Sequence, residues 1–407
     1  MTTAMHRVWG PELSPFVLKL EAMLAYRQIP FRRLPRDGSR LENTRAAWRI
    51  DRAKSNRTAT RPNSDPLDEF PLVPFLLTPE DQVLYDSSAL AGWLDTNPNA
   101  FGARLRPEDA ALRFVCNFLD EGYDEFGLYM VHHNRWKLAA GDNGDPGLRL
   151  AREYRHLRPP GIAPVMAWWF ERRQVRRLPY LFSVAPKGYD VPALSKGKTA
   201  PSRHGFPPTH DILERSWERC LLSMEALLAE QPWILGGGFT LADASAYGQL
   251  SMNLTDTGAA RRLRELAPRV HAWLEAIRDR RHVGARGELR FSPLLAPLLR
   301  VFVDTFVPLM RANDAAYERA LVVGETLFNE KAFDVGRSLF DGEMLGRPYR
   351  SVVKTFQVRV WRDLRSCWSG LTQSDRSRIA TAFGGYDIGE DLGVPQAALI
   401  AAGDPDS

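Results

Sequence analysis

Two short stretches of the sequence place hydroxyl and carboxylate groups where a helix is expected to begin. Ser14 stands directly before Pro15, and this Ser-Pro pair is a strong signal for a helix start. A hydroxyl in this position favours a bound anion, because the helix dipole and the O–H donor act together. Asp86 and Ser87 precede a second apolar helix, so this pair offers an acceptor for a cation and donors for an anion.

A third stretch, Leu72-Val73-Pro74, lies at the start of an apolar run. Each stretch also has a simpler structural reading. Ser14 could be only a helix cap, Pro74 could be an edge-strand proline, and Asp86-Ser87 could cap a helix and do nothing more. Taken singly, these simpler readings are the commoner ones. Taken together, in this order along the chain, the three stretches favour a binding site.

The elements around these residues must bring them together. Residues 6–9 and 29–34 are expected to be strands on either side of a helix that starts at Ser14, which makes a β-α-β unit. Two further strands, 72–77 and 82–85, are joined by Thr-Pro-Glu-Asp, and a helix over 87–94 follows them. Between these two halves we expect a helix over about 40–52 and a long loop.

The three stretches, in this order, resemble the N-terminal domain of glutathione transferases. The segment from Trp9 to Val17, WGPELSPFV, is similar to the W-x-SPF start of the serine-type enzymes, especially the plant tau class. Leu72-Val73-Pro74 resembles the hydrophobic-Pro junction whose proline is cis in this fold. Asp86-Ser87 resembles the acidic-Ser pair after the fourth strand. The resemblance covers about residues 6–97 and again 211–280, and it implies a thioredoxin-like α/β domain.

The resemblance also implies a role for each residue toward glutathione. Ser14 would face the glutathione sulfur, and its hydroxyl would stabilise the thiolate. Val73, before the cis Pro74, would pair with the cysteinyl backbone as an added strand. Ser87 and the helix N-terminus behind it would bind the γ-glutamyl carboxylate, and Asp86 would accept from the ammonium group. The glycyl carboxylate needs a basic residue, and the candidates Arg40, Arg45, Arg49 and Arg52 stay open.

From Pro107 onward the sequence predicts long helices and few strands. One helix is expected over 107 to about 138, and another over 211–230. The segment from Trp233 to Ser245, WILGGGFTLADAS, resembles the start of the central helix of the family's second domain. There Thr240 is an N-cap and Asp243 stands at the third helical position, which is a structural capping box and not a catalytic pair.

We therefore expect three parts. Residues 1–98 form the thioredoxin-like glutathione-binding domain, and residues 99–284 form an all-α domain with an insertion near 137–210. Residues 285–407 form a mainly helical extension with a short β-hairpin near 338–350 and a helix over about 351–368. The segment over 35–70 is a second insertion, and the roles of both insertions and of the extension are left open by the sequence.

The composition narrows the class of protein. The chain has 407 residues, 44% of them hydrophobic and 25% charged, which is typical of a soluble globular protein of two or three domains. A net charge of +5 is mild for this length, so a nucleic-acid partner is not expected. The three cysteines are far apart in sequence and form no metal-binding spacing, so no metal is expected. No apolar run is long enough to span a membrane, and we expect a cytoplasmic protein.

Two functions follow from these features. The first is a glutathione-dependent transferase or lyase, with glutathione as co-substrate, acting on a small hydrophobic electrophile, as in detoxification. No cysteine precedes Cys116, so thiol-disulfide exchange through an enzyme cysteine is not expected. The second is a non-catalytic interaction module of the same fold, as in metaxins and the failed-axon-connections proteins, which the insertions favour. A homodimer is kept open as the oligomeric state.

Overall fold

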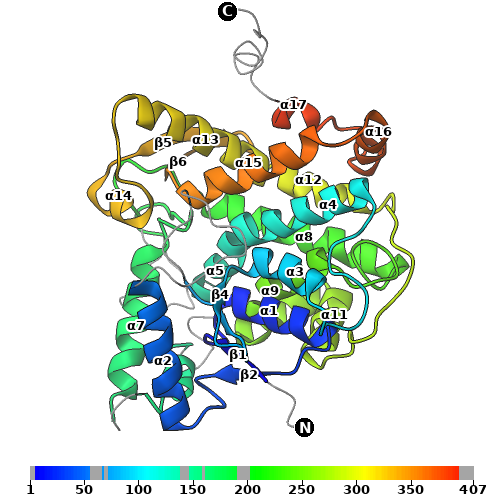
Figure 1. The fold of residues 1–407 in the computed structure, drawn as a ribbon. Helices are drawn as coiled ribbons and strands as arrows, with labels where there is room; N and C mark the ends of the chain where they lie inside the picture. The colour runs from blue at the N-terminus through cyan, green and yellow to red at the C-terminus, as the bar shows by residue number, and fades with distance from the viewer. Residues whose placement is uncertain are drawn as a thin grey trace, which may run out of the picture.

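The computed structural model describes residues 5–55, 67, 72–137, 146–157, 161–189 and 202–393. It contains a small α/β unit followed by a mainly helical chain, as the sequence predicts (Figure 1). Parts of the two predicted insertions, over 35–70 and near 137–210, fall outside the described residues. In the described ranges, no helix is both long enough and apolar enough to cross a membrane.

The N-terminal unit is a four-stranded sheet in the order β2-β1-β3-β4. Strand β1 pairs in parallel with β2 and antiparallel with β3, and β3 pairs antiparallel with β4. This order is the predicted β-α-β unit joined to a β-β-α unit. The elements are β1 (His6–Trp9), α1 (Pro15–Tyr26), β2 (Phe31–Leu34), α2 (Arg40–Ser55), β3 (Phe75–Leu77), β4 (Val83–Tyr85) and α3 (Ser87–Thr96).

The following helices form the second part of the chain. The predicted helix over 107–138 is interrupted in the structure: a π-helical turn, η1, separates α4 from α5. A π-turn inserts an extra residue into the helix and changes which side chains face inward. The elements are α4 (Ala110–Gly122), η1 (Tyr123–Gly127), α5 (Leu128–Lys137), α6 (Pro146–Glu153), α7 (Ala163–Arg177), α8 (His210–Glu230), α9 (Leu241–Leu250), η2 (Ser251–Leu254), α10 (Thr257–Leu266) and α11 (Pro268–Arg278).

The extension covers the helices on the side away from the sheet (Figure 1). Its hairpin and the helix after it lie close to where the sequence predicts them. The elements are α12 (Leu295–Val303), α13 (Phe306–Val322), α14 (Asn329–Val335), β5 (Leu339–Met344), β6 (Arg347–Val352), α15 (Thr355–Ser369), α16 (Gln373–Ala382) and α17 (Gly389–Leu392).

One hydrophobic core runs through all three parts. It includes Leu20 of α1, Phe118 of α4, Leu250 of α9 and Trp361 of α15, all buried. The extension therefore shares its core with the rest of the chain. The domain boundaries at 98 and 284 remain a prediction from the sequence.

Helix α1 is held in place by close packing against α9. A Cβ added to Gly248 of α9 would lie 2.7 Å from the carbonyl oxygen of Pro15 and 2.8 Å from the Cβ of Lys19, both in α1. Only a residue without a side chain allows these two helices to approach so closely. The contact fixes the end of α1 that carries Ser14.

Candidate functional site

A cavity of about 520 Å³ lies between the sheet domain, the helical part and the extension. Its lining includes all five residues that the sequence assigns to glutathione: Ser14, Val73, Pro74, Asp86 and Ser87. The structure thus brings the three stretches to one place. A volume of this size suits a ligand of the size of a drug or a cofactor.

Ser14 lies at the N-terminus of α1 and is 9% exposed. Its side chain makes no capping hydrogen bond, although its backbone carbonyl accepts from the N–H groups of Val17 and Leu18. Across the described part of the chain, no hydrogen bond holds the hydroxyl. The hydroxyl therefore does not have the ordinary role of a serine before proline, and it is available to a ligand in the cavity.

The Val73-Pro74 peptide bond is cis, as the resemblance implies. Strand β3 begins after it, at Phe75, so Val73 lies outside the ladder. Within the described ranges, neither the N–H nor the C=O of Val73 makes a hydrogen bond. Both groups are free to pair with an extended peptide, which is the geometry of an added strand.

Helix α3 presents its first turn to the cavity. Asp86 caps this helix, because its Oδ1 accepts from the N–H groups of Ser88 and Ala89, each at 3.1 Å. Ser87, buried and at the first helical position, keeps its own N–H and hydroxyl beside the cavity. Asp86 has a φ of 73°, a region that costs a non-glycine residue about 1–3 kcal/mol. Such strain at a cavity wall is typical of functional sites.

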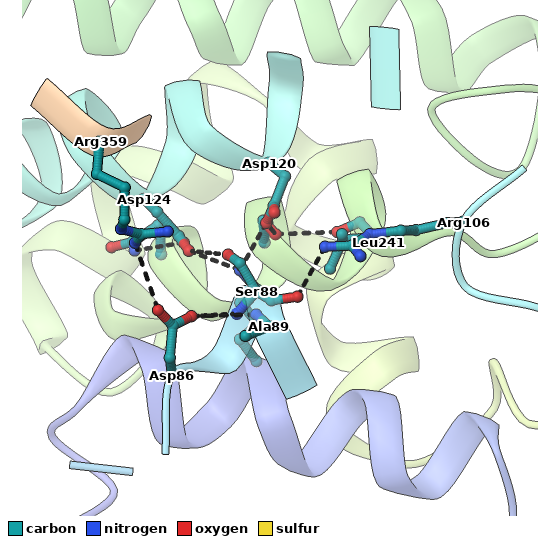
Figure 2. Close-up of polar contacts among 11 residues, drawn as sticks. Asp86, Ser88, Ala89, Arg106, Asp120, Asp124, Leu241 and Arg359 are labelled. Carbon is teal, nitrogen blue, oxygen red and sulfur yellow. Dashed lines mark hydrogen bonds and ion pairs between the residues drawn. The ribbon is translucent and has the colours of Figure 1, made fainter. Parts of the chain in front are cut away.

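The second carboxylate oxygen of Asp86 has a partner that the sequence did not indicate. Arg359 of α15 reaches down from the extension, and its Nη2 lies 3.4 Å from Asp86 Oδ2 (Figure 2). Arg359 also pairs with Asp363 at 3.3 Å and is only 8% exposed. The extension thus brings a buried cation to the carboxylate that was expected to accept from the glutathione ammonium group.

Behind the cavity lies a buried ion cluster. Lys19 of α1 is fully buried, and its Nζ donates to Asp120 Oδ1 at 2.5 Å, Asp124 Oδ2 at 2.6 Å and Ser88 Oγ at 2.8 Å. Burial acts to lower the pKa of Lys19, but the two carboxylates outweigh it and raise the pKa above its usual value. Figure 2 shows Ser88 between Asp86 and the two aspartates. The cluster ties α1, α3 and the α4–η1 segment together.

A further acidic residue of the cavity wall, Glu125, lies in the π-helical turn η1. Glu125 is 8% exposed, and its Oε2 accepts from Nε2 of Gln357 of α15 at 2.9 Å. Burial raises the pKa of Glu125 to about 8, although the Gln357 hydrogen bond lowers it. Glu121 lines the same wall, and burial with the charges of Asp120 and Asp124 raises its pKa as well.

Other polar groups of the wall come from several elements. The cavity lining includes the basic residues Arg135, Arg173, Arg177, Lys354 and Arg359. The candidates for the glycyl carboxylate do not line the cavity; they lie on α2 and are Arg40, Arg45, Arg49 and Arg52.

The cavity lining also includes His132. Burial lowers the pKa of His132 to about 3, so its imidazole is neutral. Within the described ranges, no cluster of three or more His, Cys, Asp or Glu residues could hold a metal.

The capping box at the start of α9 is present. Asp243 Oδ2 accepts from the N–H of Thr240 at 2.9 Å and from its hydroxyl at 2.8 Å. Asp243 Oδ1 accepts in addition from the N–H of Ile234 at 2.8 Å. All three residues are buried and none lines the cavity, which supports a structural role.

Sequence reasoning missed the residues that α4, η1 and α15 contribute. The run from Asp120 to Glu125, DEGYDE, holds four acids in six residues, and this density on an apolar helix was the available signal. Lys354, Gln357 and Arg359 gave no local signal, since their partners are far away in sequence.

Two family models match the chain. The model described as "Glutathione S-transferase, N-terminal domain" matches residues 13–97, and the model described as "Glutathione S-transferase, C-terminal domain" matches residues 207–276. No curated protein matches the sequence.

Several solved structures are similar to parts of the chain. Beta-etherase LigF from Sphingobium sp. strain SYK-6 is 16% identical, with 74% of this chain and 99% of that chain covered and a TM-score of 0.40. Glutathione transferase GSTFuA3 from Phanerochaete chrysosporium is 14% identical, with coverage of 69% and 98% and a TM-score of 0.42. A family member from Pseudomonas fluorescens Pf-5 with bound glutathione is 18% identical, with coverage of 70% and 100% and a TM-score of 0.32.

Proposed function

Because this chain belongs to the glutathione transferase superfamily, we propose that it is a glutathione-dependent transferase or lyase that uses Ser14 to activate the thiol. The observation that carries the proposal is the Ser14 hydroxyl, which lines the cavity and caps no helix. A free thiol with a pKa of about 8.5 is only a few per cent ionised at neutral pH. A hydroxyl donor at a helix N-terminus favours the thiolate, which is the reactive form.

The other groups suit the rest of the glutathione molecule. Val73 offers a free N–H and C=O to the cysteinyl backbone, and Ser87 offers an N–H and a hydroxyl to the γ-glutamyl carboxylate. Asp86 would share its carboxylate between Arg359 and the glutathione ammonium group. The remaining lining includes Phe16, Leu128, Trp136 and Phe170, which suit a small hydrophobic electrophile.

A second function is favoured by one observation. Arg359 already contacts Asp86, so a guanidinium of the chain itself stands where the glutathione ammonium group is expected. If Arg359 excludes the ammonium group, the cavity holds no glutathione and the fold serves as an interaction module. The two functions predict opposite results with one ligand.

Titration calorimetry with glutathione decides between them. A transferase is expected to release heat on binding and to gain about 2.7 kcal/mol of stability at a ligand concentration one hundred times the dissociation constant. The matched variant for loss of binding is Ser87→Pro. It removes the free N–H and the hydroxyl at the first helical position, where proline is tolerated. Absence of both heat and thermal stabilisation at millimolar glutathione would leave the interaction module as the better proposal.

A further inference from the structure

We propose that the chain has a second binding site, which takes the phosphate group of a small phosphorylated metabolite. The site is a cavity of about 320 Å³ whose walls come from α1, β2, α9 and α11. Among the described residues, none lines both this cavity and the one that contains Ser14. The proposal therefore does not depend on the glutathione chemistry proposed above.

The hydroxyl of Tyr247 is one donor that the protein leaves unused. Tyr247 of α9 lines the second cavity and is 6% exposed. In the described ranges no hydrogen bond holds this hydroxyl, and its oxygen is not among the fully buried atoms that lack a partner. The oxygen is therefore in contact with the cavity. Burial raises the pKa of Tyr247, so the hydroxyl keeps its proton and is a donor at neutral pH.

Arg33 of β2 supplies a second unused donor, from the wall formed by the sheet. Arg33 is 7% exposed, and its Nε and Nη2 donate to the two carboxylate oxygens of Glu21, the first at 2.5 Å. Its Nη1 is buried and has no hydrogen-bond partner in the described part of the chain, and Glu12 Oε2 lies 3.7 Å from it. A buried donor without a partner is rare in folded proteins, and it points to a ligand, an ion or a water at that place.

Arg280 brings a third donor to the rim, two residues after the end of α11. Its guanidinium carbon lies 5.1 Å from the centre of the Phe31 ring, and its backbone φ of 60° is unfavourable for a residue with a side chain. Within the described ranges Arg280 makes no ion pair. The other arginines at the rim each have a carboxylate partner: Arg32 binds Glu42, Arg36 binds Asp37, and Arg278 binds Asp279. Arg280 is thus a cation of this cavity that no acid of the described chain neutralises directly.

The charge of the wall also favours an anion. Five arginines and three acidic residues are among the residues that line the cavity. Two of the acids are already bound, Glu21 by Arg33 and Asp37 by Arg36 Nε at 2.8 Å. The third, Glu12, has a side chain that is 42% exposed, so its carboxylate also reaches solvent. An anion that enters the cavity therefore meets unused donors, while most of the negative charge is already neutralised.

The origin of the donors favours phosphate over a carboxylate. Tyr247, Arg33 and Arg280 come from α9, from β2 and from the segment after α11, so they belong to three different walls. A carboxylate is planar and has two oxygens, which a single guanidinium satisfies in the bidentate arrangement. A phosphate group is tetrahedral and presents its oxygens in several directions. The cavity is larger than one phosphate group, and its apolar lining, which includes Leu18 and Ile277, leaves room for the body of a small metabolite.

The test is a calorimetric titration of the full chain with inorganic phosphate and with glycerol 3-phosphate, at constant ionic strength. Wild type should bind one equivalent of each, and its melting temperature should rise with ligand concentration. Tyr247→Phe removes only the hydroxyl and should weaken both ligands about tenfold or more. Its melting temperature without ligand should equal that of wild type, because the described chain gives the hydroxyl no partner. Arg280→Met should weaken both ligands to a similar extent. The control is Arg281→Met, which removes the same charge one residue further on, outside the lining, and should change binding by at most about twofold.

Each part of the proposal has a result that overturns it. If neither ligand binds to wild type at about 10 mM, the site does not exist as a phosphate site. Acetate binding as tightly as phosphate would overturn the choice of phosphate, and binding of phosphate without glycerol 3-phosphate would overturn the metabolite. Equal binding by wild type and Tyr247→Phe would place the anion elsewhere, as would competition between phosphate and glutathione. A chain that binds phosphate but not glutathione would remove the proposed transferase function and leave this site in place.

Discussion

Replacing Ser14 with alanine separates catalysis from folding, because the structure gives the hydroxyl no partner in the described chain. In the proposed site, the change would remove one O–H donor to the bound thiolate. A hydrogen bond to a charged group contributes about 1.5–3 kcal/mol, and one pKa unit corresponds to about 1.36 kcal/mol, so the pKa of the bound thiol should rise by about one to two units. At pH 6.5 a thiol with a pKa of about 7 is roughly one quarter ionised, and one with a pKa of about 8.5 is roughly 1% ionised. Conjugation at this pH should therefore fall about tenfold or more.

The same structure predicts a small effect on stability. Loss of a serine that caps a helix costs about 0.5–2 kcal/mol, but the Ser14 side chain makes no capping bond. The free energy of unfolding of Ser14→Ala should therefore stay within about 0.5 kcal/mol of wild type. Glutathione affinity should also change little, because in the proposed site Val73, Asp86 and Ser87 would hold the rest of the peptide.

The assay is the ultraviolet absorbance of the thiolate of bound glutathione as a function of pH, for wild type and for Ser14→Ala. Part of the lost conjugation rate should return at high pH, where the thiol ionises unaided. Ser88→Ala is a matched control, since the Ser88 hydroxyl already accepts from Lys19 and donates to Asp124. Identical titration curves for wild type and Ser14→Ala would refute the reasoning, since the hydroxyl would then have no contact with the sulfur.

Three further changes test other parts of the site. Asp86→Asn keeps an oxygen that can cap α3 but removes the charge and the ion pair with Arg359, so glutathione should bind about tenfold or more weakly by calorimetry, with a modest fall in melting temperature; equal binding would place the ammonium group elsewhere. Lys19→Met leaves Asp120 and Asp124 buried without their cation and should lower the free energy of unfolding by about 3–5 kcal/mol in urea titrations; a loss below about 1 kcal/mol would contradict the ion cluster. Asp243→Ala leaves three buried donors without an acceptor and should cost about 2–4 kcal/mol, more than a capping box alone, whereas unchanged melting would show that water replaces the carboxylate.

The sequence predicted the half of the site that is made of local motifs. The Ser14-Pro15 pair, the Val73-Pro74 junction and the Asp86-Ser87 pair each lie at the end of one strand or helix, where residue type and backbone geometry are tied together. Their order along the chain is enough to infer the sheet that gathers them. The capping box of Thr240 and Asp243 was predictable for the same reason.

The other half depends on contacts between distant segments. Arg359 meets Asp86 across 273 positions, and Gln357 meets Glu125 across 232 positions. No local pattern specifies such pairs, because only the packing of the extension brings them together. The π-helical turn η1 was also missed. The apolar residues keep an α-helical spacing from α4 into α5, so the sequence pattern does not show that the backbone leaves the α-helical conformation between them.

The contribution of α15 to the cavity has a consequence for synthesis on the ribosome. The segments that carry Ser14, Val73 and Ser87 leave the ribosome first, and at about 5–20 residues per second Gln357 and Arg359 follow only after tens of seconds. Until then the nascent chain has no Gln357 to orient Glu125 and no Arg359 beside Asp86. A product truncated before α15 should therefore lack this wall of the cavity even if its sheet has folded.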